Sequence, residues 1–298
     1  MSTGGLPFTV NGALPALESP VLVVQLTGWI DASAAAAGAM VSILRQLDAQ
    51  ELITFDGDTF VDYRARRPVM ELRDGVNTRI VWSVPEMRVG RDANGRDVLL
   101  LSGPEPDTAW HLFARTVGEL ASELGVTKMI GLGAYPFGAP HTRPIGVTAT
   151  TPDADVARRL GFVRNTLDAP AGVAAVLEHE LMNRGIESMG FWAQIPHYVA
   201  GMAFAAGSAA LVGAVAKETG LALDVSELAA ESLTQRERLD QLVGSNPDHV
   251  DMLQKMEAAY DAMHSPAAID IVSDLPSADQ LAAEVEQFLR DQQTGGTP

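Results

Sequence analysis

An aspartate, two histidines and an arginine have side chains that could carry proton chemistry or hold an anion. Asp31 with either His141 or His197 would make an acid/base pair if the two side chains come within hydrogen-bond reach. Arg143 could bind an anion through two parallel hydrogen bonds from its guanidinium group. These residues predict a candidate site, provided that the fold brings them together.

Three short segments hold these residues, and each follows an apolar run that is typical of a buried strand: Gly28–Ala32, Gly133–Pro144 and Gln194–His197. The carboxyl ends of parallel strands meet at one edge of an open α/β sheet, where ligands commonly bind. We therefore expect one candidate ligand or partner site at that edge. Its members are Trp29, Asp31, Tyr135, His141, Arg143, Gln194 and His197.

Purely structural roles remain open for four of these residues. Asp31 is well placed to cap the N-terminus of the helix that follows it. Trp29 can serve packing, His197 can begin the next helix, and His141 can be an exposed loop residue.

Three arginines, Arg64, Arg66 and Arg67, lie close together within the segment Asp62–Pro68. One interpretation is a solvated loop, or a set of partners for the protein's own excess carboxylates. The other is an interface that contacts the acidic tail of a neighbouring subunit.

Common catalytic and cofactor-binding motifs are absent from the sequence. There is no Gly-x-Ser-x-Gly, His-Glu-x-x-His, EF-hand loop or Walker phosphate loop. Gly131-Leu132-Gly133 follows a strand, but its spacing to Gly138 does not match a dinucleotide-binding loop. None of the lysines lies in a Gly-rich loop, which argues against an ATP-dependent reaction. We predict no cofactor and no metal site.

The composition excludes several classes of protein. The 298 residues carry 21 Lys and Arg against 38 Asp and Glu, so the net charge is −17. Such a chain is not expected to bind nucleic acid or an anionic membrane. The absence of cysteine excludes disulfides, thiolate metal sites and a cysteine nucleophile. The first ten residues, MSTGGLPFTV, lack the basic and apolar regions of a signal peptide, so we expect a cytoplasmic protein.

Apolar runs and helical periodicity alternate along the first three quarters of the chain. The expected strands are Val21–Leu26, Glu51–Phe55, Val69–Arg73, Arg79–Ser83, Lys128–Leu132, Ile145–Thr150 and Met189–Ile195, with a hairpin that pairs Glu86–Gly90 with Arg96–Leu101. The expected helices are Ala32–Leu47, Asp107–Leu124 and Ala171–Arg184. This alternation predicts a three-layer α/β/α domain with a mixed, mostly parallel sheet over residues 1–222.

The segment Tyr198–Ala216 contains no charged residue and is rich in Ala and Gly. Its length approaches that of a membrane span, but small residues supply little of the transfer energy that a span needs. We therefore expect a buried helix, packed against the sheet or between subunits.

Residues 223–298 form an acidic extension with 15 acidic and 4 basic side chains. We expect helices over Val225–Val243, His249–Met263 and Ala278–Arg290, a short strand over Ala267–Val272, and a frayed end.

Several motifs, in this order, resemble the proteasome assembly chaperone 2 family in its bacterial branch. They are Gly28-Trp29-Ile30-Asp31-Ala32, Asp62-Tyr63-Arg64-Ala65-Arg66-Arg67-Pro68, Ser102-Gly103-Pro104-Glu105-Pro106, Gly131-Leu132-Gly133-Ala134, Ala171-Gly172-Val173 and Gly190-Phe191-Trp192-Ala193-Gln194-Ile195-Pro196-His197-Tyr198. The resemblance covers roughly residues 20–220.

The resemblance implies a phosphorylase/hydrolase-like fold and a homo-oligomer, with three to five subunits by analogy. Eukaryotic and archaeal relatives act as non-enzymatic chaperones of proteasome assembly, and some dock through a C-terminal tail that contains tyrosine. This chain has Gly296-Thr297-Pro298 at those positions, so that mode of docking is not expected. The first hypothesis is thus an oligomeric interaction protein with a protein client. The alternatives are an enzyme, of hydrolase or carboxylate–amine ligase type, and a small-molecule sensor.

Overall fold

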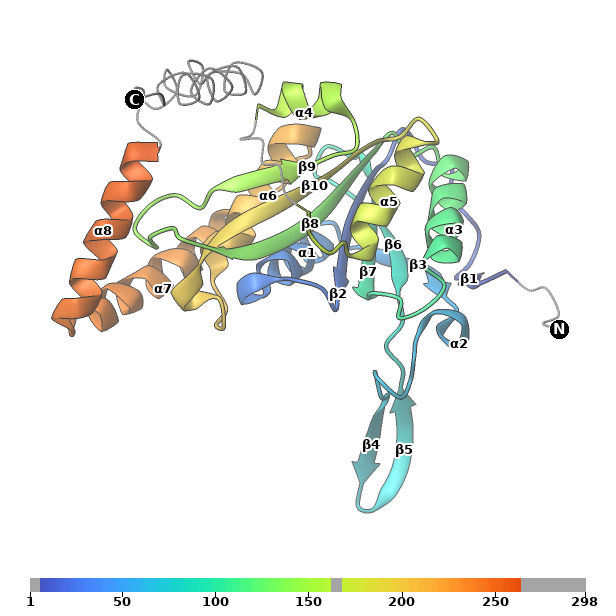
Figure 1. Cartoon of the computed structure of the whole chain (residues 1–298). Helices are drawn as coiled ribbons and strands as arrows, with labels where there is room; N and C mark the ends of the chain where they lie inside the picture. Colours follow the sequence, from blue (N-terminus) through green and yellow to red (C-terminus); the bar gives the residue numbers. More distant parts are fainter. Residues whose placement is uncertain (1–5, 162–167, 264–298) are drawn as a thin grey trace, which may run out of the picture. The chain divides into compact units, whose positions relative to one another are not determined.

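The structure is a computed structural model that describes residues 6–161 and 168–263. Eight strands form one sheet in the order β1-β3-β6-β7-β2-β8-β10-β9 (Figure 1). They are β1 (Phe8–Val10), β2 (Val21–Thr27), β3 (Gln50–Phe55), β6 (Glu86–Arg91), β7 (Asp97–Pro104), β8 (Lys128–Phe137), β9 (Val147–Thr150) and β10 (Glu187–Pro196). The helices of the described residues are α1 (Ala35–Gln46), α2 (Gly57–Phe60), α3 (Trp110–Glu123), α4 (Ala154–Leu160), α5 (Val173–Met182), α6 (Ala205–Thr219), α7 (Ser226–Gly244) and α8 (Pro247–Met263), with the short 3-10 helices η1 (Ala32–Ala34) and η2 (His197–Val199).

The centre of the sheet is parallel and its flanks are antiparallel. β2 pairs in parallel with β7 and β8, and β8 pairs in parallel with β10. β3 runs in the same direction as these four strands, whereas β1, β6 and β9 run in the opposite direction. The predicted α/β fold with a mixed, mostly parallel sheet is therefore confirmed.

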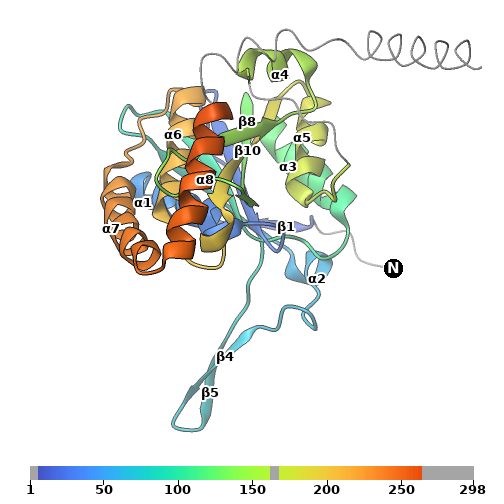
Figure 2. The same ribbon diagram turned by 60° about the vertical axis from the view of Figure 1, so that its left-hand side comes forward.

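Two hydrophobic cores lie on opposite faces of the sheet. Successive side chains of β2 point to opposite faces of the sheet. Val23 therefore belongs to one core, and Leu22 and Val24 belong to the other. Helices α1 and α6 cover the first face, and α3 and α5 cover the second (Figure 2). The three-layer arrangement follows directly from this alternation.

The Ala/Gly-rich segment is buried only in part, so the prediction of one buried helix over Tyr198–Ala216 is wrong for its first third. Residues 201–203 form an exposed turn between η2 and α6. From Phe204 to Ala216 every residue is buried or half-buried. A Cβ on Gly207 would lie 2.9 Å from Ala35 Cβ and 2.5 Å from Ile195 Cδ1, so glycine permits the close packing of α6 on α1 and β10.

Strand β8 is longer than expected, because residues 133–137 continue it instead of forming a loop. The parallel pairing of β8 with β10 runs without interruption from Lys128↔Glu187 to Phe137↔Pro196. This pairing satisfies the backbone of a Gly- and Pro-containing stretch whose composition is typical of a loop. The short elements β1, α2 and α4 were not expected from the sequence.

Strands β4 (Val69–Arg73) and β5 (Val76–Val81) form a separate two-stranded hairpin that extends away from the sheet (Figure 1). Their pairing joins Val69 to Val81 and contains a bulge after Glu71. The predicted strand Val69–Arg73 is confirmed, and its partner begins earlier than the predicted Arg79–Ser83.

The chain divides into two compact units, residues 1–242 and 243–298. The helices expected over Val225–Val243 and His249–Met263 are confirmed as α7 and α8. The predicted boundary after residue 222 stays a prediction. The expected strand Ala267–Val272, helix Ala278–Arg290 and frayed end lie outside the described residues.

The helices of residues 6–161 and 168–263 are each too short or too polar to cross a bilayer. Helix α6, which includes most of the uncharged segment Tyr198–Ala216, has 15 residues. A span needs about 20 residues.

Candidate functional site

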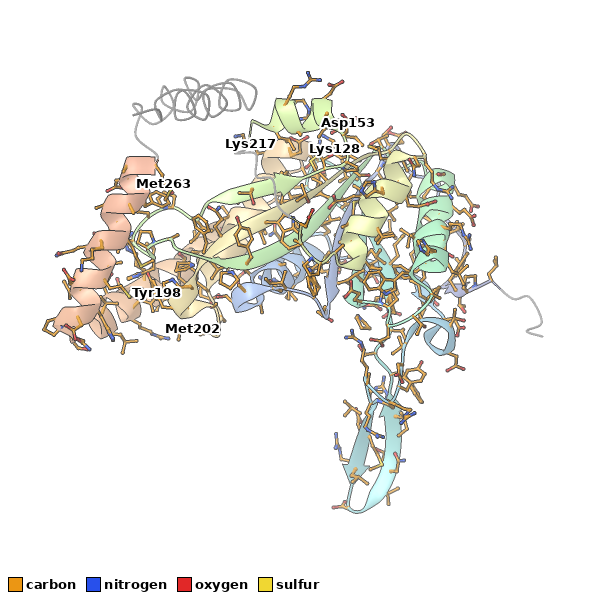
Figure 3. All side chains as sticks on the ribbon, in the orientation of Figure 1. Lys128, Asp153, Tyr198, Met202, Lys217 and Met263 are labelled. Carbon is orange, nitrogen blue, oxygen red and sulfur yellow. The ribbon has the colours of Figure 1, made fainter. Side chains whose placement is uncertain are left out.

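The carboxyl ends of β2, β7, β8 and β10 meet at one edge of the sheet, as expected for parallel strands. Tyr198, which follows β10, marks this edge, and Lys128 lies at the opposite end of β8 (Figure 3). The edge has two sides, because α1 and α6 cover one face of the sheet and α5 covers the other. The predicted site residues are distributed over both sides.

A small hollow opens on the α5 side of this edge. Its volume is about 30 Å³, which is room for about two water-sized groups. Trp29, Trp192, Glu105 and Glu178 supply its large and charged side chains. The other lining residues are Leu26, Ile30, Gly131, Leu132, Gly133, Gly172, Ala174 and Gly190.

Glycines leave the space that the two indoles and Glu178 occupy. A Cβ on Gly133 would lie 2.4 Å from the Trp192 ring, and one on Gly172 would lie 2.9 Å from Trp29 Cδ1. A Cβ on Gly190 would lie 2.6 Å from Glu178 Oε1. The glycines therefore shape the hollow.

The two carboxylates of the hollow have different partners. Glu105 is buried at the end of β7, and its Oε1 accepts a hydrogen bond from the backbone N–H of Val173, the first residue of α5. Glu178 is 5% exposed, and its Oε1 accepts a hydrogen bond of 3.3 Å from Thr150 Oγ1. Burial raises the pKa of Glu178 to about 7, against a weaker lowering by the Thr150 hydroxyl. This carboxyl group thus changes charge near neutral pH.

Tyr135 and Gln194 occupy paired positions on β8 and β10. Gln194 Nε2 donates a hydrogen bond of 2.9 Å to Tyr135 Oη, and this hydroxyl lies 3.5 Å from Thr148 Oγ1. Trp192 Nε1 donates to Thr150 Oγ1 at 3.1 Å. Two predicted site residues are therefore in direct contact, in a polar row that continues toward the hollow.

His141 forms part of a different group. Its Nδ1 lies 2.7 Å from Tyr198 Oη, and its Nε2 lies 3.0 Å from Asp240 Oδ1 on α7. The ring is buried, so the interpretation of His141 as an exposed loop residue is wrong. These contacts connect the loop after β8 to η2 and α7.

Asp31 serves the backbone of the helix that follows it. Its two carboxylate oxygens accept hydrogen bonds from Ala36 N at 2.8 Å and Ala37 N at 3.0 Å. Burial raises its pKa, against a weaker lowering by these backbone bonds. The capping role foreseen for Asp31 is what the geometry provides, whereas the nitrogens of His141 face Tyr198 and Asp240.

The remaining predicted residues lie apart from the hollow or at its rim. His197 is exposed, and its ring contacts Tyr198 edge to face. Arg143 is half-buried in the loop after β8, with Nη1 at 3.4 Å from Thr142 Oγ1. Trp29 is 44% exposed and is the predicted site residue that lines the hollow.

The three arginines of the cluster Arg64, Arg66 and Arg67 do not all fit the same interpretation. Arg66 Nε donates to both carboxylate oxygens of Asp107, at 2.9 and 3.1 Å, so it is a partner for one of the protein's own carboxylates. Arg64 and Arg67 are exposed at the base of the β4–β5 hairpin. Their role as an interface stays a prediction.

Sequence reasoning missed Glu105 and Glu178 as site residues. Glu105 stands in the Ser102–Pro106 motif of the family resemblance, which was a usable signal. Glu178 is preceded and followed by helix-forming residues, and nothing in its neighbourhood distinguishes it from a solvent-facing glutamate. In the described part of the chain, no group of three or more His, Asp or Glu side chains could hold a metal ion.

Comparisons with known proteins agree with this fold. The family model described as "PAC2 family" matches residues 25–243. A Corynebacterium glutamicum protein of unknown function is similar, with 27% identity, a TM-score of 0.81 and coverage of 88% of this chain and 99% of that one. A Mycobacterium tuberculosis protein of unknown function has 30% identity, a TM-score of 0.80 and coverage of 89% and 95%.

A second Mycobacterium tuberculosis structure, described as a proteasome-assembly chaperone homologue, has 27% identity and a TM-score of 0.73. It is covered over 99% of its length by 78% of this chain. No curated protein matches the sequence with significance. The match of the family model to most of the chain shows that this protein belongs to the PAC2 family.

Proposed function

We propose that this protein is a non-enzymatic interaction protein of the assembly-chaperone type, which forms a homo-oligomer through its β4–β5 hairpin and binds a protein client. A similar structure described as a proteasome-assembly chaperone homologue supports this type. The observation that carries the proposal is the exposed apolar surface of the hairpin.

The hairpin exposes apolar side chains on both of its strands. Val69 is 64% exposed, Leu72 51% and Val76 61%, and Met70 and Trp82 are also half-exposed. An isolated two-stranded hairpin is marginally stable in water, because it lacks a layer to pack against. Several exposed apolar side chains on one projecting element favour an interaction site there.

The charge of the hairpin region favours a second copy of this chain as the occupant. Residues 62–84 contain five arginines and three acidic side chains, a net charge of +2, whereas the whole chain carries −17. Within the hairpin, Arg73 and Arg79 are balanced by Glu71 and Asp74, so the excess positive charge lies at its base, where Arg64 and Arg67 are exposed. This basic base of an apolar projection is complementary to the acidic body of another copy. A ring of three to five subunits is the expected form of this assembly.

The paired substitution Val69→Glu with Val76→Glu tests this interface. Two carboxylates placed in an apolar, acid-facing contact would be desolvated and repelled, which weakens association by at least about a hundredfold. Light scattering coupled to size exclusion should show an oligomer for the wild type and a particle of 31.6 kDa for the variant.

Val41→Glu provides the matched control. Val41 is 61% exposed on the outer face of α1, so the same residue type is changed at the same exposure. This variant should retain the mass of the wild type. A wild type that remains monomeric at micromolar concentration, or a loss of mass in both variants, contradicts the proposal.

A second candidate function is ligand binding at the carboxyl edge, as a small-molecule sensor or as an enzyme of hydrolase or carboxylate–amine ligase type. The hollow beside Glu178 is the observation that favours it. Native mass spectrometry of the protein captured from cell extract distinguishes the two. A stoichiometric protein partner supports the chaperone role, and a retained small-molecule mass without a partner supports the second.

A further inference from the structure

The hollow beside Glu178 leaves one carboxylate oxygen without a partner. Glu178 Oε1 accepts a hydrogen bond from Thr150 Oγ1, whereas Oε2 receives none from the described residues and is not a fully enclosed atom, so it remains accessible. A charged group as deeply buried as this one is normally paired, because an unpaired buried charge is costly. An oxygen of this kind at the wall of a cavity is complementary to a donor from outside the chain.

The charge of the lining restricts that donor to a cation or a neutral group. Glu105 and Glu178 are the ionisable side chains among the residues that line the hollow in the described chain, and both are acidic. An anion would be repelled by both carboxylates.

The walls favour a cation over a neutral group. Trp29 and Trp192 both line the hollow, and tryptophan is the side chain that binds cations best through its ring face. Trp192 Nε1 already donates to Thr150 Oγ1, so its polar atom is engaged and its ring carbons are what remain for contact with a ligand. Buried carboxylates combined with indole walls resemble the cages that bind ammonium groups.

The size of the hollow favours a primary ammonium group. Its volume of about 30 Å³ accepts a group of the size of one or two waters. An –NH₃⁺ group is a compact charge with three donors, whereas a guanidinium group is a wide planar fork. Trp29 lines the hollow and is half-exposed, so a methylene stem on the ammonium group could extend along it toward solvent.

We propose that the hollow bounded by Trp29, Trp192, Glu105 and Glu178 is a binding site for a primary ammonium group on an unbranched alkyl stem. The ammonium donates to Glu178 Oε2 and lies against the indole rings. This site does not depend on the oligomer proposed above, and it is separate from the hairpin. The shared chemistry is that of a lysine side chain of a protein and of a free alkyl amine.

The four tryptophans provide an internal control for a binding experiment on the full chain. Butylammonium is titrated into ¹⁵N-labelled protein at pH 8, and the indole N–H resonances are followed by NMR. The resonances of Trp29 and Trp192 should shift with saturation, whereas those of Trp82 and Trp110 should not. Butanol, the neutral probe of similar shape, should bind at least tenfold more weakly. Equal shifts for both probes, or none, overturn the proposal.

Binding should also depend on pH, because the charged form of Glu178 is the one that attracts a cation. Affinity for butylammonium should be about tenfold lower at pH 6 than at pH 8. Of the other titratable groups nearby, Glu105 lines the same hollow, His179 is exposed, and Glu180 is paired with Arg184 at 2.8 Å. If the affinity for butylammonium does not change between pH 6 and pH 8, the proposal is overturned, and this test needs no substituted protein.

Glu178→Gln should reduce affinity at pH 8 by at least tenfold and remove its dependence on pH. Glu180→Gln, on the same helix but outside the hollow, should leave affinity and pH dependence unchanged. Equal affinity of Glu178→Gln and the wild type at pH 8 overturns the proposal.

Two further probes distinguish the source of the ammonium group. Nα-acetyl-lysine methylamide represents a protein side chain, and putrescine represents a free amine. Binding of the lysine derivative as tightly as butylammonium indicates a protein ligand, and binding of putrescine alone indicates a small amine. Failure of all the ammonium probes overturns the proposal.

Discussion

Helix α6 and the β4–β5 hairpin are both rich in apolar residues, and they are used in opposite ways. The apolar side chains Leu211, Val212 and Val215 of α6 are buried against α1 and the sheet. Those of the hairpin, among them Val69 and Val76, are exposed to the same solvent that α6 excludes. Apolar composition alone therefore does not predict which segment stabilises the fold and which is available to a partner.

The difference has a thermodynamic consequence. Substitutions in the buried body should change the free energy of unfolding, because each removes or crowds contacts within the chain. Substitutions on the hairpin should leave that free energy nearly unchanged and act on association instead. Four predictions test this separation on one scale, the free energy of unfolding.

The largest effect is expected for Glu178→Gln in the buried body. The folded-state pKa of about 7 lies above the ordinary glutamate value of 4.5, so the folded protein binds this proton more tightly than the unfolded chain. The stability from this group is complete below pH 4.5 and is lost as the pH rises to about 7. Glu178→Gln should thus match the wild type at pH 4.5 and exceed it by about 3 kcal/mol at pH 8.

Urea denaturation at pH 4.5, 6 and 8 measures this difference. A constant offset between the two proteins across this range would show that the carboxyl group is solvated in the folded state.

The next largest effect is expected for substitution of Gly207 in α6, and Gly213 on the same helix serves as its comparison. Gly207→Ala should destabilise the fold by about 1–3 kcal/mol, because its methyl group would crowd Ala35 and Ile195. Gly213→Ala should stabilise it by about 0.5–1 kcal/mol, because nothing lies within 4 Å of the added Cβ. Thermal and urea denaturation should show changes of opposite sign. Changes of equal sign would place Gly207 outside a close contact.

A smaller loss is expected for Asp31→Ala. Its two hydrogen bonds to Ala36 N and Ala37 N would be lost, which costs about 1–2 kcal/mol at a helix N-terminus. Asp31→Asn keeps one acceptor oxygen and should recover about half of the loss. An Asp31→Ala variant as stable as the wild type would argue against capping as its role.

The smallest effect is expected on the hairpin. Leu72→Ser should change the free energy of unfolding by less than about 0.5 kcal/mol, because the side chain is half-exposed and packs on no other layer. Denaturation is measured at a concentration at which the wild type is monomeric, so that association does not contribute. A loss of more than about 2 kcal/mol would mean that the hairpin packs on its own chain.

Strong local patterns in the sequence account for most of the fold that could be predicted. The continuous apolar run Val21–Leu26 predicted a central strand, and Gly125 and Gly185, both at positive φ, follow the ends of predicted helices. Strand β8 was predicted too short because its register with β10, a long-range property, decides its length. The exposure of the hairpin was not predictable, because alternation in a strand does not show whether a layer covers it.

The sequence predicted that several residues reach the carboxyl edge of the sheet, but it did not identify Glu105 and Glu178, which line the hollow there. Topology alone placed Trp29, Tyr135 and Gln194 at the carboxyl ends of β2, β8 and β10. The capping contact of Asp31 was foreseen from the sequence, whereas no sequence pattern revealed the contacts of His141 with Tyr198 and Asp240. Glu178 gains its raised pKa from tertiary burial, which is not a property of its neighbours in the sequence.

Native mass spectrometry of the chain with residues 70–80 replaced by a two-residue Gly-Ser linker tests the central claim most directly. Val69 and Val81 are paired, so the linker joins positions that are already adjacent. The wild type should appear as a closed homo-oligomer and the shortened chain at the mass of one subunit, with the same unfolding midpoint when both are diluted to monomers. A shortened chain that keeps the oligomeric mass of the wild type would contradict the role of the hairpin in self-association.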